Sequence, residues 1–290
     1  RAGGEKISGR GLRWATQFFT DEYLVRALSR DALAPIEMDI SPTRLRVLDP
    51  ACGTGNFLVG AFDRLLAAQP GERTVETAIA ETLVGYDIEQ VLAELTSLQL
   101  VVRATAALKR LPESRPRCFH GEASDEKGTL VRSNNPLSPA IHEGDLRVFI
   151  TNPPFLGRRL MSATLREYLR TEYPLAKNDL CAAFVLRCLQ WLRGSDRAAL
   201  VHQTNWMYLS SFAPLRAELA NGFVLERCTD LGANAFADLR GEKARVGLSV
   251  FVVKAARSVP PNDARDIGPN VDTFVGLSDH DLEGKRRMLE

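Results

Sequence analysis

Residues 44–57 read RLRVLDPACGTGNF, and this stretch decides the fold. Val47 and Leu48 are the apolar core of a short strand, and Gly53 and Gly55 follow at once in a tight loop. An amphipathic run over residues 57–68 comes next and predicts a helix. A strand, a glycine loop and a helix in this order predict the start of a βαβ unit, with the loop at the carboxyl end of its strand.

The rest of the chain repeats this alternation. Residues 82–87 read TLVGYD, a second strand that ends in a carboxylate, and residues 89–109 follow as a helix. That helix is predicted to bury one apolar face, formed by Leu92, Leu95, Leu98 and Val102. Further strands are predicted at residues 117–120, 147–151, 198–202, 224–230 and 246–254, and further helices at 162–172, 180–192 and 212–220.

Strands that alternate with helices indicate a doubly wound, mostly parallel sheet with helices on both faces. The last two strands are separated only by a loop and can pair antiparallel. We therefore expect an α/β, Rossmann-like sheet of seven strands. Residues 271–277 are a candidate for a last edge strand.

Composition narrows the class of protein. The 290 residues are 45% hydrophobic and 25% charged, which allows one large domain with a sizeable core. We find neither an apolar run of about 18 residues nor a signal-peptide pattern, so we expect a cytoplasmic protein without membrane partners. The 5 cysteines form no C-x-x-C pair and the 4 histidines share no ligand spacing, which predicts reduced thiols and no metal site. A net charge of +1 neither supports nor excludes a nucleic acid partner.

Polar residues follow the ends of three predicted strands, where an open parallel sheet binds its ligands. Gly53 and Gly55 let the backbone turn tightly and approach a ligand, although such a loop is equally typical of a packing turn or a dinucleotide site. Asp87 is suited to hydrogen-bond a ribose diol, and its alternative role is to cap the following helix. The third strand end is followed by Asn152-Pro153-Pro154-Phe155, which is the most specific of the three motifs.

Two consecutive prolines make this motif stiff and rich in hydrogen-bond acceptors, because they donate no backbone N–H. The amino group of adenine is a poor nucleophile, and the Asn152 side-chain oxygen and the Pro153 carbonyl can hold its two hydrogens while its lone pair attacks a methyl group. Phe155 would stack on the base, which must be flipped out of the duplex. The alternative is a proline turn that carries a core phenylalanine.

Together, the glycine loop and this motif resemble the N6-adenine DNA methyltransferases, whose signature is D-P-A-C-G-x-G-x-F followed later by N-P-P-[YF]. Residues 16–20 read TQFFT and resemble the family's F-[YF]-T-P segment, with Asp21 where proline is usual. Residues 178–184 and 200–207 are similar to later motifs of type IIG restriction and BREX-type phage-defence methyltransferases. The order of motifs is gamma-like, and the resemblance covers about residues 17–254.

This resemblance implies methyl transfer from S-adenosylmethionine to adenine N6 in DNA, on a methyltransferase sheet. The catalytic residues it implies are Asn152, Pro153, Pro154 and Phe155. The cofactor-binding residues it implies are Thr20, Asp49, Ala51, Gly53, Gly55, Asp87, Glu122 and Asn152. Phe236 would be a second aromatic support for the flipped base, or else a loop phenylalanine that closes the core. Arg158 and Arg159 follow the catalytic motif and are predicted to contact DNA phosphates.

The expected division is an N-terminal segment with the cofactor-contacting motif (residues 1–44), a catalytic domain (45–256), and a linker leading into a missing target-recognition region (257–290). We interpret the chain, which opens at Arg1, as a fragment. The expected partners are double-stranded DNA with a flipped adenine, a recognition domain or specificity subunit, and other defence proteins. Two alternatives stay open: methylation of cytosine N4, an RNA guanine or a protein glutamine, and a non-catalytic module that binds cofactor or DNA.

Overall fold

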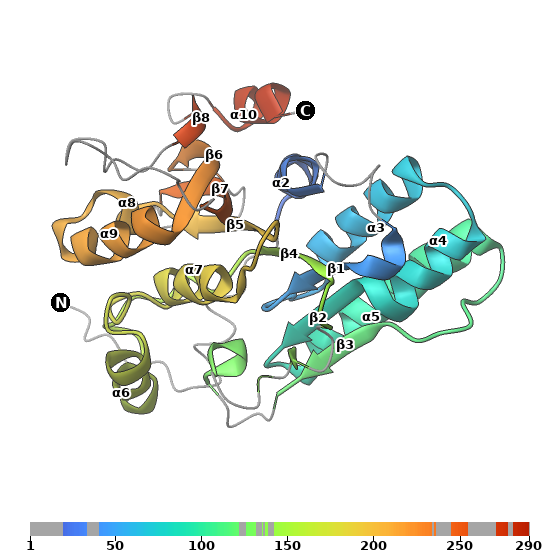
Figure 1. The fold of residues 1–290 in the computed structure, drawn as a ribbon, viewed down its shortest axis with the longest axis horizontal. Coiled ribbons are helices and arrows are strands. Elements are labelled where there is room, and N and C mark those ends of the chain that lie inside the picture. Colours follow the sequence, from blue (N-terminus) through green and yellow to red (C-terminus); the bar gives the residue numbers. More distant parts are fainter. Residues whose placement is uncertain are drawn as a thin grey trace, which may run out of the picture.

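A central sheet crosses the whole molecule in the computed structural model, which describes residues 20–33, 41–121, 126–131, 135, 137–138, 142–233, 235, 245–254, 271–277 and 281–289 (Figure 1). Within these residues the sheet has eight strands, in the order β3-β2-β1-β4-β5-β7-β6-β8. Their bounds are β1 Leu45–Asp49, β2 Leu83–Asp87, β3 Arg117–His120, β4 Leu146–Thr151, β5 Arg197–Gln203, β6 Phe223–Gly232, β7 Val246–Val253 and β8 Val271–Gly276.

Strands β1 to β5 are parallel, β7 runs antiparallel to β5 and β6, and β8 pairs parallel with β6. The predicted α/β, mostly parallel sheet is confirmed, including its antiparallel pair. It has one strand more than the expected seven, because residues 271–276 add the edge strand. The chain runs from β1 outward to β3 and then returns to β4 on the other side of β1. The carboxyl ends of β1 and β4 therefore flank the point where strand order reverses, which is where such sheets bind ligands.

Helices cover both faces of the sheet. Their bounds are α2 Glu22–Leu33, α3 Asn56–Ala68, α4 Glu72–Thr77, α5 Gln90–Leu108, α6 Ala163–Glu172, α7 Leu180–Trp191, α8 Asn205–Tyr208, α9 Ala213–Gly222 and α10 Leu282–Leu289. Helices α2, α4, α8 and α10 were not predicted from the sequence. Because β8 and α10 follow residue 256 and pack on β6 and α2, the layered structure continues beyond the expected limit of the catalytic domain.

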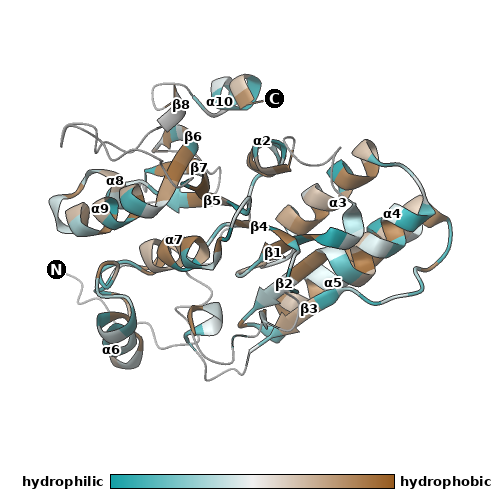
Figure 2. Cartoon of the chain, in the orientation of Figure 1, coloured by the Kyte–Doolittle hydropathy of each residue, from teal (hydrophilic) through white to brown (hydrophobic). Residues whose placement is uncertain are grey.

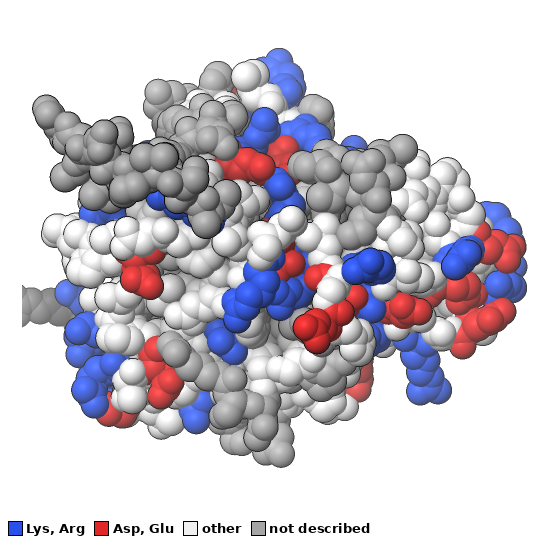
Figure 3. All heavy atoms as spheres, viewed as in Figure 1, with Lys and Arg blue, Asp and Glu red and all other residues white. Residues whose placement is uncertain are grey.

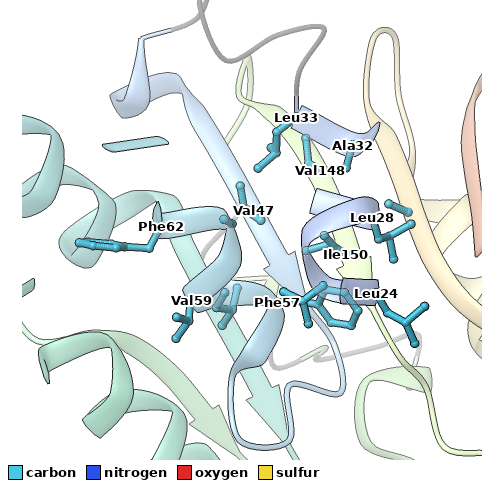
Figure 4. Close-up of a cluster of buried hydrophobic side chains, with 14 of the residues drawn as sticks. Leu24, Leu28, Ala32, Leu33, Val47, Phe57, Val59, Phe62, Val148 and Ile150 are labelled. Atoms are coloured by element: carbon cyan, nitrogen blue, oxygen red, sulfur yellow. The ribbon is translucent and has the colours of Figure 1, made fainter. Parts of the chain in front are cut away.

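Two hydrophobic clusters form the core, one on each face of the sheet. Neighbouring residues of one strand point to opposite faces and so belong to different clusters. On β1, Val47 belongs to the cluster under α2, α3 and α5, and Leu48 belongs to the cluster under α6, α7 and α9. Figure 4 shows side chains of α2, α3 and β4 gathered in the first of these clusters, with Leu28, Phe57 and Ile150 among them. The hydrophobic colouring in Figure 2 runs through the strands, as burial on both faces requires.

Helix α5 buries a different face from the expected one. Leu95, Leu98 and Val102 are 39%, 58% and 58% exposed, whereas Leu100 and Ala104 are fully buried. The helix is apolar on most sides, so its small residues decide which side can approach the sheet closely. By length and composition alone α5 could cross a membrane, and in the structure it packs with one side against α3, β2 and β3.

Acidic and basic side chains are interleaved at the end of the molecule formed by α4 and α5 (Figure 3). Arg110 at this end forms ion pairs with Glu72, Glu76 and Glu113, with nitrogen to oxygen distances of 3.3, 2.7 and 3.7 Å. Exposed pairs of this kind contribute little stability, so this end is a solvated surface.

Candidate active site

A cavity of about 170 Å³ opens at the carboxyl edge of the sheet, between the ends of β1, β2 and β4. Seven of the residues predicted for the site line it: Thr20, Asp49, Ala51, Gly53, Asp87, Asn152 and Pro154. Its wall is completed by residues that sequence reasoning missed, among them Asn56, Glu89, Leu92, Glu126, Lys127, Thr129, Leu156 and Phe184. The structure therefore brings the ends of three strands, far apart in the sequence, into one pocket.

The glycine loop has the backbone that the sequence predicted. Gly53 and Gly55 have φ angles of +54° and +92°, in the left-handed region that favours glycine. A Cβ atom at Gly55 would lie 2.8 Å from Cγ2 of Thr96 on α5. The Thr96 hydroxyl donates a 2.8 Å hydrogen bond to the Gly53 carbonyl, and the Gln99 amide donates a 2.6 Å bond to the Thr54 carbonyl. These contacts hold the loop against α5 and explain which face of α5 is buried.

Asp49 ends β1 and is 1% exposed. The Ala51 N–H donates to its Oδ1 at 3.2 Å. Burial raises the pKa of Asp49 to about 7, and the nearby negative charge of Asp87 acts in the same direction, against the hydrogen bonds to the carboxylate. A cationic group placed beside Asp49 would favour its ionised form.

Asp87 ends β2 and holds two loops together. Its Oδ2 accepts the Gly53 N–H at 3.0 Å and its Oδ1 accepts the Glu89 N–H at 2.9 Å. Burial raises the pKa of Asp87. Glu89, the N-cap residue of α5, brings a second carboxylate to the cavity two residues later. The sequence signal for Glu89 was its position at the start of the predicted helix, two residues after Asp87, which was predicted to bind the ribose.

The catalytic motif follows β4. Asn152 is half-buried, and its Nδ2 donates a 3.0 Å hydrogen bond to Thr20 Oγ1. Its Oδ1 is buried and has no hydrogen-bond partner among the described residues. Pro153 is buried, Pro154 lines the cavity, and the Phe155 ring is 8% exposed and packs in the core cluster under α2 and α3.

The end of this motif is fastened to the start of α7. The Leu180 N–H donates to the Leu156 carbonyl at 2.9 Å, and the Arg158 N–H donates to the Asn178 carbonyl at 2.9 Å. The Asp179 side chain caps α7 by accepting the Ala182 N–H at 3.0 Å. The segment over residues 178–180 therefore supports the catalytic loop from behind.

Of the remaining predicted residues, Arg158 and Arg159 are exposed immediately after the motif. Gly55 is buried at the N-cap of α3, next to the cavity-lining Asn56. Glu122 and Phe236 lie outside the described residues, so their predicted roles stay predictions. The cavity wall at residues 126–129 belongs to an irregular connection with no pattern that marks it, and the Thr129 hydroxyl bonds to the Pro50 carbonyl at 3.0 Å.

Within the described ranges, no group of three His, Cys, Asp or Glu side chains has a geometry that could hold a metal ion. His202 is a buried structural residue. Trp206 Nε1 donates to its Nδ1 at 3.1 Å, and its Nε2 lies 2.7 Å from the Ser249 hydroxyl. Burial lowers the pKa of His202 to about 4, so the ring is neutral near pH 7.

The sequence profile of the Eco57I restriction-modification methylase family matches residues 81–236, which is more than half of the chain. The chain belongs to this family. Membership in the Eco57I family confirms the resemblance predicted from the two motifs. The matched residues include Asp87 and the whole Asn152 to Phe155 motif.

Two curated relatives are similar to this Eco57I-family chain. The adenine-specific methyltransferase PglX of Lacticaseibacillus casei (strain Zhang) is 23% identical, over 94% of this chain and 28% of its own length. The adenine-specific methyltransferase BrxX of Escherichia coli O9:H4 (strain HS) is 33% identical, over 48% of this chain and 11% of its own length. The chain therefore spans well under half of the length of these relatives.

The fold is also similar to that of a protein in a solved protein–DNA complex. The DrdV protein of a DrdV–DNA complex, determined by cryo-electron microscopy, superposes with a TM-score of 0.70 and 17% identity. The superposition covers 97% of this chain and 30% of DrdV. At this identity the likeness establishes the fold alone, and it extends over almost the whole chain.

Proposed function

We propose that this chain is the catalytic core of an enzyme that transfers a methyl group from S-adenosylmethionine to N6 of adenine in DNA, in a restriction-modification or BREX phage-defence system. The observation that carries the proposal is the Asn152 side-chain oxygen. It is buried, lacks a partner among the described residues, and belongs to a side chain that lines the cavity beside the glycine loop. An unpaired buried acceptor is costly, and a ligand N–H removes the cost.

The residues of the cavity suit the cofactor. Asp49 offers a carboxylate to the ammonium group of the methionine moiety, and Asp87 with Glu89 offers carboxylates to a ribose diol. Gly53, with its positive φ and open space where a Cβ would stand, lets a ligand approach the backbone. S-adenosylmethionine supplies an electrophilic methyl group on a sulfonium.

The loop residues supply positioning and acceptors for the amino group. Asn152 Oδ1 accepts one hydrogen of the adenine N6 group, and the Pro153 carbonyl accepts the other. The two acceptors draw the amino group out of the plane of the ring, so that its lone pair faces the methyl group. The prolines keep this geometry stiff because their φ angles are fixed.

Stacking of the base on Phe155 is part of the proposal and has a structural cost. The ring is 8% exposed and packs in the core, so stacking requires the loop to turn the ring toward the cavity when the base enters. Base stacking on an aromatic ring contributes about 1 to 3 kcal/mol per base, which is enough to offset a modest rearrangement.

Double-stranded DNA with a flipped adenine is the proposed substrate. Arg158 and Arg159 are exposed next to the catalytic loop, where they can contact phosphates on either side of the flipped base. Basic side chains also gather near the centre of the face drawn in Figure 3. We further propose that a target-recognition domain or a specificity subunit reads the DNA sequence, that other defence proteins complete the system, and that the enzyme works in the cytoplasm.

The test is transfer of labelled methyl groups from S-adenosylmethionine to unmethylated genomic DNA, followed by nucleoside analysis. Asn152→Ala is compared with the wild type and with Asn221→Ala, an exposed site on α9 outside the cavity lining. We expect N6-methyladenine from the wild type and from Asn221→Ala, and none from Asn152→Ala. Labelled cytosine, RNA or protein would contradict the assignment to adenine. Cofactor binding without transfer to any acceptor would favour a non-catalytic module.

A further inference from the structure

Three residues that line the cavity are joined by hydrogen bonds. Asn56 Nδ2 donates to the Thr20 carbonyl at 3.1 Å, and Asn152 Nδ2 donates to the Thr20 hydroxyl at 3.0 Å. Asn56 is the first residue of α3, directly after the glycine loop, and Gly55 takes the N-cap position. The chain of contacts therefore connects the cofactor loop with the catalytic loop through a residue that lies 132 positions before Asn152.

The orientation of the Asn152 amide decides whether the site can accept the amino group of a base. A half-turn of the amide exchanges its oxygen, an acceptor, with its NH₂ group, which is a donor only. An NH₂ group facing the base would meet the two N–H donors of adenine N6 without a hydrogen bond. In the observed orientation the Thr20 hydroxyl accepts from Nδ2, and Oδ1 is left for the ligand.

The Asn56 side chain has a position that suits it to hold Thr20. Its Oδ1 accepts a 3.4 Å hydrogen bond from the Thr54 hydroxyl, and its Nδ2 donates to the Thr20 carbonyl. Thr20 itself is 8% exposed. The contact from Asn56 therefore fixes the backbone from which this hydroxyl projects.

We propose that Asn56 is a positioning residue for methyl transfer: it holds the Thr20 backbone, so that the Thr20 hydroxyl holds the Asn152 amide in place beside the target amino group. This inference rests on the proposed function. It predicts that loss of either contact slows the chemical step, because catalysis of this kind depends on the placement of the reacting groups. The rate at saturating cofactor, and not the cofactor affinity, is therefore the quantity that reports this role.

Three variants separate the role of the Thr20 hydroxyl from that of the Asn56 side chain. Thr20→Val removes the hydroxyl at nearly constant volume, Thr20→Ser retains it, and Asn56→Ala removes the contact to the Thr20 carbonyl. We expect Thr20→Val and Asn56→Ala each to lower the single-turnover rate at saturating cofactor about tenfold, or about 1.4 kcal/mol. The double variant is expected to be no slower than Thr20→Val alone, since Asn56 acts through the hydroxyl. Thr20→Ser is expected to recover most of the rate.

The full chain is assayed in each case, with thermal unfolding to verify the fold and calorimetric titration of S-adenosylhomocysteine to measure cofactor binding. Thr171→Val, at an exposed site on α6, is the matched control for loss of a threonine hydroxyl. Additive losses in the double variant would overturn the positioning role, as would weaker S-adenosylhomocysteine binding with an unchanged rate at saturation. A wild-type chain that binds S-adenosylhomocysteine but methylates no DNA would instead contradict the proposed function.

Discussion

Asp49→Asn is expected to stabilise the ligand-free chain while it weakens cofactor binding. Burial raises the pKa of Asp49 from 3.8 to about 7 in the folded chain. The unfolded chain therefore loses this proton near pH 4 and the folded chain near pH 7, so the stability of the fold falls as the pH rises through this window. The difference corresponds to about 4 kcal/mol above pH 7, at about 1.4 kcal/mol per pKa unit. Asparagine carries no charge and still accepts the Ala51 N–H.

The effect of Asp49 on binding has the opposite sign. An ammonium group beside Asp49 favours the carboxylate, so the cofactor binds the ionised form and releases a proton where the free carboxyl is protonated. With a pKa of about 7, the wild-type affinity is expected to be about tenfold lower at about pH 6 than at about pH 8. Asp49→Asn removes the charge, so its affinity is expected to be low at both pH values.

Two measurements test the predicted effects of Asp49 on the stability of the fold and on cofactor binding. Urea unfolding at about pH 8 compares the stability of the wild type, Asp49→Asn and the control Asp63→Asn, a half-exposed carboxylate on α3 that pairs with Arg103. Titration with S-adenosylhomocysteine at about pH 6 and pH 8 compares their affinities. The reasoning is refuted if Asp49→Asn is less stable than the wild type at about pH 8, or if the wild-type affinity is the same at both pH values.

Three further changes test the loop, the buried face of α5 and the DNA contacts. Gly55→Ala places a Cβ atom against α5 on a residue with left-handed backbone, so it should lower the free energy of unfolding by about 1 to 3 kcal/mol and remove most of the cofactor affinity. Unfolding and titration curves that match those of the wild type would contradict this. Leu100→Ala should lower the free energy of unfolding in urea by about 2 to 5 kcal/mol, whereas Leu98→Gln should lower it by under about 0.5 kcal/mol. The reverse order would show that α5 buries its other face. Charge reversal of Arg158 and Arg159 should weaken DNA binding and lower the salt dependence of the affinity, and equal affinities at one fixed salt concentration would exclude the phosphate contacts.

Sequence patterns located the site because its main residues stand where apolar runs end. Asp49, Asp87 and Asn152 each follow a buried strand, and parallel strands bring their carboxyl ends to one edge. The buried face of α5 could not be predicted in the same way. That helix is apolar on several sides, so its orientation depends on tertiary contacts, among them the bonds from Thr96 to the Gly53 carbonyl and from Gln99 to the Thr54 carbonyl.

The contacts of Thr20 show a second limit of sequence reasoning. The motif around residue 20 predicted a cofactor contact, and nothing in the sequence relates Thr20 to the Asn152 amide 132 residues later. The cavity wall at residues 126–129 carries no periodicity either, because irregular connections are placed by tertiary contacts such as the bond from Thr129 to the Pro50 carbonyl.

Three features that reduce the stability of the free chain lie together at the carboxyl edge of the sheet. A buried carboxyl resists ionisation at Asp49, two glycines hold positive φ angles, and the Asn152 oxygen is buried without a partner among the described residues. A sequence selected for stability alone would remove each of them with a single substitution, whereas a sequence selected for binding keeps them where ligand groups can compensate their cost. Because these three features share one edge of the sheet, ligands that bind there are expected to offset the cost of all three. Binding of the cofactor and of the target base is thus expected to stabilise the same loops, those that carry Asp49, the two glycines and Asn152.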